Sequence, residues 1–326
     1  MDGGSSSVTS DNGCCAAASG EIPGVSALAI PGAMLFALIL AACGEPPAQT
    51  LLQYSSAPAV KVSPVYRLAP HPLYSPQRLG KIFQPLIDHL NHNLPGAQVE
   101  LEGSRDYQAC EQKFRARGPA FLMPNPWQTI EAMKAGYHVV AMWGDAEDFK
   151  GVFIVRRDSG IKSPDDLRGK AVSYPSPTAL AAAIMPQYYL HNRGIDINRD
   201  IQNLYVGSQE SSIMTVYMGT SAAGATWPPP WRLFQNAHPT EAAQLKVIWE
   251  TSPLINNSVM AHNDVPEAIR EAVRQTLLDL SQTPEGKRIL AGMETSRFHV
   301  ANDASYDVVR QYIARFEQSV RPVEEK

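Results

Sequence analysis

From residue 65 onward, hydrophobic and polar positions follow two alternating patterns. Short apolar runs, typical of buried strands, alternate with stretches in which apolar residues recur every third or fourth position, as on an amphipathic helix. The clearest such stripe is formed by Leu79, Ile82, Phe83, Leu86, Ile87 and Leu90. The predicted strands are 65–69, 99–101, 120–123, 138–142, 151–155, 171–174, 203–206 and 246–250. Helices are predicted over 79–90, 106–117, 130–135, 178–193, 210–218, 266–282 and 305–319. This order predicts an α/β protein of two lobes, each with a mainly parallel sheet flanked by helices.

The start of the chain predicts export. A ten-residue apolar run over 33–42 ends in two alanines followed by Cys43. The run is too short to span a membrane but fits the core of a signal peptide. We therefore expect residues 1–43 to be a leader with a lipoprotein-type signal, and Cys43 to carry the lipid that anchors the protein in the periplasm. The leader lacks the usual positive charge, since the first Lys or Arg is Lys61; the alternative is an apolar spacer. Residues 44–60, rich in Pro, Ala, Ser and Gln, are expected to form a flexible tether.

Composition narrows the class of partner. The chain has 28 Lys and Arg against 32 Asp and Glu, so nothing favours nucleic acid. Beyond the leader only Cys110 remains, which excludes an internal disulfide in the mature chain. No later apolar run approaches the length of a membrane span, so membrane contact is expected only through Cys43.

Two strand-to-helix turns are candidate anion sites. In the first, Ser176 and Thr178 precede a predicted helix, whose free N–H groups and dipole attract an anion. Gly207 and Ser208 form the second turn. The alternative in both places is an ordinary helix cap, which also favours Ser and Thr.

Aromatic side chains flank several turns. Trp127 precedes a predicted helix, and Trp227 and Trp231 enclose three prolines, which predicts a polyproline-like wall. These residues either line a pocket or fasten loops.

Motifs for catalysis are absent from the sequence. It contains no nucleotide-binding glycine loop, no HExxH motif, no nucleophile elbow and no Cys–His arrangement. His89 and His92 share a helix face but have no evident third ligand. The sequence therefore predicts no catalytic residue, no metal site and no cofactor.

Several segments carry a family resemblance. Residues 66–74, the helix end 83–90 (FQPLIDHL), Asp106-Tyr107 and the string 159–170 (SGIKSPDDLRGK) resemble the phosphate/phosphite/phosphonate-binding (PhnD-like) solute-binding proteins of ABC importers. These proteins belong to the type II periplasmic-binding-protein superfamily, and the resemblance runs from about residue 65 to 298. It implies two lobes joined by two crossover strands: lobe 1 from 61–156 plus 254–326, and lobe 2 from 157–253.

The resemblance also implies a ligand site. By position, Ser176 and Thr178 match one binding turn of the family and Gly207 and Ser208 a second. With the neighbouring aromatic residues and Gln209, the expected ligand-binding residues are Tyr74, Trp127, Tyr174, Ser176, Thr178, Gly207, Ser208, Gln209 and Trp227. Some positions depart from the family pattern: Pro177 and Ala179 replace hydroxyl and glycine neighbours, Gln209 replaces a common His, and 224–227 replaces an acidic stretch. The site is therefore expected to be more aromatic and less polar than usual, which disfavours an aminophosphonate.

The resulting expectation is a protein that closes its lobes around a small oxyanion (phosphonate, phosphite or phosphate) and delivers it to an ABC permease in the inner membrane. Three alternatives remain. One is a periplasmic sensor or partner protein on the same fold with a more aromatic or uncharged ligand. Another is an enzyme on this fold, for which only Glu210 offers an acid in the mapped loops. The third is a protein that has lost ligand binding.

Overall fold

The computed structural model describes residues 63–324. The leader, the tether and Cys43 lie outside these residues, so the predictions made for them stay predictions. The described residues fall in one unit of the chain, Val60–Lys326.

The first sheet has six strands in the order β11-β4-β10-β3-β1-β2. Strand β1 pairs in parallel with β2 and β3, whereas β10 runs antiparallel to β3 and β4, and β11 antiparallel to β4. The strands are β1 (Val65–Pro70), β2 (Gln98–Leu101), β3 (Phe121–Met123), β4 (Tyr137–Trp143), β10 (Ser258–His262) and β11 (Phe298–His299).

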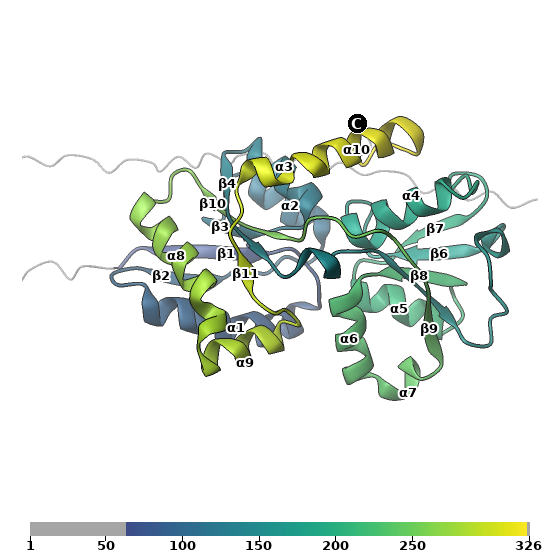
Figure 1. The fold of residues 1–326 in the computed structure, drawn as a ribbon, viewed down its shortest axis with the longest axis horizontal. Helices are drawn as coiled ribbons and strands as arrows, with labels where there is room; N and C mark the ends of the chain where they lie inside the picture. Colours follow the sequence, from purple (N-terminus) through teal and green to yellow (C-terminus); the bar gives the residue numbers. More distant parts are fainter. Residues whose placement is uncertain (1–62, 325–326) are drawn as a thin grey trace, which may run out of the picture. The chain divides into compact units, whose positions relative to one another are not determined.

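Six helices cover this sheet. They are α1 (Pro76–Asn93), α2 (Tyr107–Arg115), α3 (Pro126–Met133), α8 (Glu267–Asp279), α9 (Pro284–Gly292) and α10 (Asp307–Ser319). Figure 1 shows α1, α8 and α9 on one side of the sheet and α2, α3 and α10 on the other. The apolar stripe predicted for α1 is buried, with Leu79, Phe83, Leu86, Ile87 and Leu90 facing the core.

The second sheet has five strands in the order β7-β6-β8-β5-β9. Strand β6 pairs in parallel with β7 and β8, and β5 runs antiparallel to β8 and β9. The strands are β5 (Val152–Arg156), β6 (Ala171–Tyr174), β7 (Gln202–Tyr205), β8 (Ala223–Thr226) and β9 (Leu245–Glu250). The helices are α4 (Met185–His191), α5 (Gln209–Tyr217), α6 (Pro228–Ala237) and α7 (Pro239–Ala242), and a π-helical turn (Leu180–Ile184) runs directly into α4.

Two α/β sheets, as predicted, are thus confirmed, but both are mixed rather than mainly parallel. The antiparallel members include the strands at which the chain enters and leaves each sheet, β4 and β10 in the first and β5 and β9 in the second. A strand that arrives from the other sheet needs no helical crossover, and so it is free to pair antiparallel.

Two short segments carry the chain between the sheets, residues 144–151 and 251–257. They lie side by side: the N–H of Thr251 donates to the carbonyl of Gly151 (2.9 Å), and the N–H of Leu254 donates to the carbonyl of Phe149 (2.9 Å). The predicted lobe boundary at residue 156 needs correction. Strand β5 belongs to the second sheet, because it pairs with β8 and β9 on both edges.

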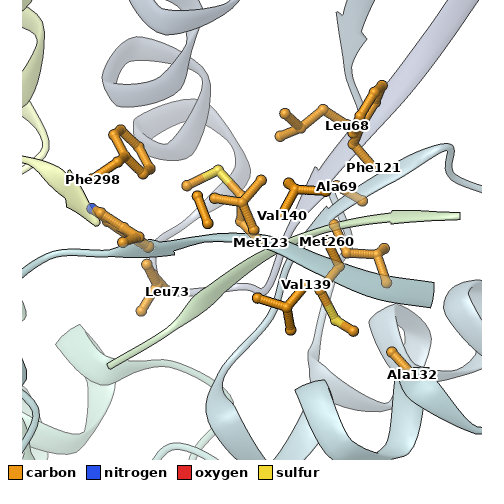
Figure 2. Close-up of a cluster of buried hydrophobic side chains, with 14 of the residues drawn as sticks. Leu68, Ala69, Leu73, Phe121, Met123, Ala132, Val139, Val140, Met260 and Phe298 are labelled. Carbon is orange, nitrogen blue, oxygen red and sulfur yellow. The ribbon is translucent and has the colours of Figure 1, made fainter. Parts of the chain in front are cut away.

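The core of the first sheet is a continuous apolar cluster. Figure 2 shows side chains from neighbouring strands meeting there, among them Leu68 and Ala69 of β1, Phe121 of β3 and Met260 of β10. Burying a leucine, phenylalanine or methionine side chain contributes about 1.5–3 kcal/mol. This cluster therefore holds the strand ends, where the loops begin, in fixed positions.

The three prolines between Trp227 and Trp231 do not form a polyproline wall. They form the first turn of α6, with Trp227 at the N-cap. The sequence prediction was wrong here because first-turn positions need no N–H donor and favour the fixed φ of proline.

Within residues 63–324, no helix combines the length and the apolar character needed to cross a membrane.

Candidate functional site

A cavity lies between the two sheets, where loops from both converge. The space left open inside it is about 10 Å³, room for about one water molecule. The first sheet contributes residues that follow or precede strands, the crossover contributes Phe149, and the second sheet contributes the starts of three helices. The lining residues are His71, Tyr107, Asn125, Phe149, Ala179, Leu180, Ala181, Ala182, Gln209, Trp227 and Asn257.

Residues 179–182, which we call the anion turn, line this cavity at the start of a helical run. The N–H groups of Ala183 (2.7 Å) and Ile184 (3.2 Å) both donate to the carbonyl of Ala179, so the helical run begins with a π-type turn. In the described chain, the preceding N–H groups of Leu180, Ala181 and Ala182 meet no carbonyl, as is usual in a first helical turn. Free amides together with the positive end of the helix dipole attract an anion.

Asn257, the last residue of the second crossover segment, lines the same cavity. It is fully buried (0 % exposed), and neither Nδ2 nor Oδ1 has a hydrogen-bond partner among the described residues. Its backbone is held firmly: its N–H donates to Asn256 Oδ1 (2.7 Å), and its carbonyl accepts from the N–H of Trp143 (2.7 Å). A buried amide without partners costs free energy, so its retention here is characteristic of a binding group.

His71 lies in the loop after β1 and is neutral. Its Nδ1 is 2.9 Å from the carbonyl oxygen of Met123; a carbonyl only accepts, so Nδ1 carries the proton. Burial lowers the pKa of His71 to about 4. The remaining ring nitrogen, Nε2, is therefore a hydrogen-bond acceptor at neutral pH.

Tyr107 and Gln209 connect the two sides of the cavity. Gln209 Nε2 donates to the Tyr107 hydroxyl (3.3 Å), while Gln209 Oε1 accepts from Thr226 Oγ1 (2.8 Å). Burial raises the pKa of Tyr107 well above its usual value, so the phenol stays protonated.

Asn125 makes a second connection between the sheets. Its Oδ1 caps α3 by accepting from the N–H groups of Trp127 (3.0 Å) and Gln128 (3.1 Å), and its Nδ2 donates to the carbonyl of Thr178 (3.2 Å). This side chain therefore holds the segment just before the anion turn against the first sheet.

One wall of the cavity is aromatic. The rings of Phe149 and Trp227 lie 5.5 Å apart, tilted by 58°. Both side chains are almost fully buried, so this wall offers an apolar surface.

The cavity presents no full charge. Among the described residues, those that line it include no Lys, Arg, Asp or Glu. Arg78 is engaged elsewhere, with Glu210 Oε2 (3.1 Å) and the carbonyl of Leu233 (3.0 Å). Nor are three His, Cys, Asp or Glu side chains grouped for metal binding anywhere in residues 63–324. The cavity can thus hold a small ligand through neutral donors and acceptors.

Comparison with known proteins decides the family. Residues 68–306 match the family model described as "ABC transporter, phosphonate, periplasmic substrate-binding protein". The chain belongs to this family. The predicted resemblance is therefore confirmed. The chain is a periplasmic substrate-binding protein of an ABC importer, and its family consists of solute-binding proteins rather than enzymes.

Solved structures agree on the fold of this phosphonate-family protein. A binding-protein component of an ABC phosphonate transporter from Pseudomonas aeruginosa superposes with a TM-score of 0.74, at 20% identity, over 79% of this chain and 88% of that one. PhnD1 from Prochlorococcus marinus, solved in complex with methylphosphonate, gives 0.72 at 20% identity, over 78% and 98%. The aliphatic sulphonate-binding protein of Escherichia coli gives 0.54 at 15% identity, over 80% and 94%. The type II periplasmic-binding-protein fold is thus confirmed.

Two of the site residues predicted for this family member, Gln209 and Trp227, line the cavity. Ser176 and Thr178 do not. They lie just before the anion turn, with their hydroxyl oxygens 3.0 Å apart, and line a separate groove.

The Thr178 hydroxyl makes an internal contact between the two sheets. It donates to Glu111 Oε1 (2.6 Å), which also accepts from Gln128 Nε2 (3.1 Å). Burial raises the pKa of Glu111. We call Thr178 and Glu111 the latch, because they join the second sheet to helix α2 of the first.

The other predicted residues do not line this cavity. Tyr74 and Trp127 are buried in the first apolar cluster, and Tyr174 is buried in the second. Gly207 has a φ of +86°, a left-handed conformation that favours glycine, and Ser208 caps α5 by accepting from the N–H of Ser211 (3.1 Å).

Five cavity residues were not predicted from the sequence: His71, Tyr107, Asn125, Phe149 and Asn257. His71 and Asn125 each lie two residues after the end of a predicted strand, the usual region of ligand contacts in an α/β sheet. Asn257 precedes β10, which runs antiparallel to β3, so its position at the same sheet edge follows only from the pairing.

Proposed function

We propose that this phosphonate-family protein binds a small phosphorus oxyanion with a short apolar substituent in the cavity and delivers it to an ABC permease. The observation that carries the proposal is the pairing of the free amides of the anion turn with the unpartnered Asn257 in one buried space. This open space lies far below the usual range of ligand pockets, which favours a ligand of few atoms that enters when the two sheets move apart.

The donors available are sufficient for useful affinity. Micromolar binding requires about −8 kcal/mol. A hydrogen bond from a neutral donor to a charged ligand contributes roughly 1.5–3 kcal/mol. The three amides of the anion turn and Asn257 Nδ2 together reach this range before the costs of closure and ordering.

The aromatic wall supports an alkyl substituent. Phe149 and Trp227 place apolar surface beside the anion turn, so a methyl group would be buried there while the oxygens face the amides. Methylphosphonate, the ligand named for the PhnD1 structure, combines both features.

Hinge closure supplies the mechanism of capture. The two crossover segments are short and paired, and they allow the sheets to rotate about them. Closure forms three contacts between the sheets: Asn125 to the carbonyl of Thr178, Thr178 to Glu111, and Gln209 to Tyr107. The closed form presents both lobes to the permease in one arrangement.

The proposal includes membrane attachment through lipidated Cys43. What supports it is the apolar run over 33–42 that ends at this cysteine, together with the periplasmic location of the family. Release of the protein from membranes by Cys43→Ser would test it; a soluble protein without that change would contradict it.

A thermal-shift screen of the full chain tests the ligand class. The panel contains phosphate, phosphite, methylphosphonate, 2-aminoethylphosphonate, sulfonates and uncharged aromatic compounds. We expect a phosphorus oxyanion to raise Tm, Asn257→Ala to abolish this rise, and Ser208→Ala to keep it, since Ser208 only caps α5. A response confined to uncharged or aromatic compounds would instead favour a sensor on the same fold.

A further inference from the structure

The cavity contains two hydrogen-bond acceptors as well as donors. Nδ1 of His71 is committed to the carbonyl of Met123, so its free Nε2 can only accept. Asn257 brings an amide whose two ends are both unpartnered and buried, so one end donates and the other accepts. A ligand that satisfies this site must therefore donate at least one hydrogen bond.

Building on the proposed function, we propose that the site selects the singly protonated monoanion of a phosphorus oxyanion, whose P–OH group donates to His71 Nε2 or Asn257 Oδ1. A fully deprotonated dianion offers only acceptors and would leave both protein acceptors facing oxygen lone pairs. The monoanion leaves its other oxygens for the amides of Leu180, Ala181 and Ala182.

The charge of the cavity supports the same conclusion. No cationic side chain lines it, so a second negative charge on the ligand would be buried without a counter-ion. The amides and the helix dipole together compensate roughly half an elementary charge. One negative charge suits this environment better than two.

The same chemistry predicts exclusion of sulfonates. Methanesulfonate has the size and the tetrahedral oxygens of methylphosphonate, but at neutral pH it carries no proton. Sites built to pair with a ligand hydroxyl reject analogues that lack it, because buried polar groups are then left unpaired.

Titratable groups near His71 bear on a pH test, among them Glu111, whose pKa burial raises. Tyr107 lies edge-on to its ring at 6.0 Å, with Cys110 and Glu111 next on α2. The pKa of His71 is about 4, that of Cys110 is raised to about 12, and that of Tyr107 is raised above its usual value. On α5, Glu210 is held by Arg78 and His238.

Calorimetry on the full chain tests the proposal with methylphosphonate and methanesulfonate. We expect methylphosphonate to bind at least about 100-fold more tightly. Its affinity should fall about tenfold for each pH unit above its second pKa. ³¹P resonances of the bound ligand should keep the chemical shift of the monoanion at a pH where the free ligand is a dianion. His71→Leu should reduce the preference over methanesulfonate.

The outcomes distinguish a failure of monoanion selection from a failure of the proposed function. Equal binding of methanesulfonate, or affinity that is flat or rises with pH, would overturn the selection of the monoanion while leaving oxyanion capture intact. If neither compound bound, and no phosphorus oxyanion raised Tm, the proposed function itself would fail. The wild-type comparison decides the matter even if His71→Leu does not fold.

Discussion

Replacing Asn257 with leucine should stabilise the unliganded protein and abolish binding. Leucine has the same number of side-chain heavy atoms with the same branching, but it lacks the two polar groups that have no protein partner at this buried position. Removing a buried unsatisfied group recovers about 1–3 kcal/mol of the free energy of unfolding. At about 2–4 °C per kcal/mol, Tm of the unliganded chain should rise by several degrees.

The neighbouring Asn256 provides a matched control. Its Nδ2 donates to the carbonyl of Asp145 (2.8 Å), and its Oδ1 accepts from the N–H of Asn257 (2.7 Å). Asn256→Leu should therefore lower the free energy of unfolding by about 1–3 kcal/mol. Urea denaturation of both variants, with and without methylphosphonate, measures the difference. A destabilised Asn257→Leu, or one that still gains stability from the ligand, would refute the reasoning.

Three further predictions concern pH, the hinge and the latch. Because His71 has a pKa of about 4 when folded and 6.5 as a free group, the unfolded chain binds the extra proton between these values. The contribution of His71 to the free energy of unfolding should fall by about 3 kcal/mol as pH drops from 6.5 to 4. Denaturation over this pH range should show a smaller loss of stability for His71→Gln than for the wild type. The same pH profile for both proteins would contradict this prediction. A Cβ at Gly151 would lie 2.5 Å from a carbonyl oxygen of the anion turn, so Gly151→Ala should lower both Tm and ligand affinity. Gly80→Ala is the control, because a Cβ there would have no atom within 4 Å and should lower neither. Equal effects of the two substitutions in calorimetry would contradict this prediction. Thr178→Val removes one of the two donors to Glu111 and should weaken ligand binding by about tenfold through loss of the contact between the sheets. Calorimetry measures this change, and unchanged affinity would show that the latch does not couple to binding.

The general architecture follows from local sequence patterns. Burial repeats every two residues in a strand and every three or four in a helix, so stripes such as that of α1 are visible in the sequence. The direction of the returning strands is not visible in the sequence, since β10 could pair with either neighbour in a parallel or an antiparallel orientation. Its antiparallel pairing follows from how the two sheets are connected.

The site was only partly predictable for a similar reason. The sequence pattern predicts a helix that starts at Thr178, but the π-helical turn begins at Leu180. The two hydroxyls therefore precede the anion turn, and that of Thr178 forms the latch with Glu111. The cavity is instead lined by the backbone of the anion turn, whose position no side chain reveals. Asn257 is recognisable only in three dimensions, because its significance lies in the absence of a protein partner within the described structure.

The most direct test of the central claim is a crystal structure of the chain with methylphosphonate. The account predicts phosphonate oxygens within hydrogen-bond distance of the amides of Leu180, Ala181 and Ala182 and of Asn257, with the methyl group against the aromatic wall. A ligand bound instead in the groove beside Ser176 and Thr178, or absent from the cavity at saturating concentration, would contradict it.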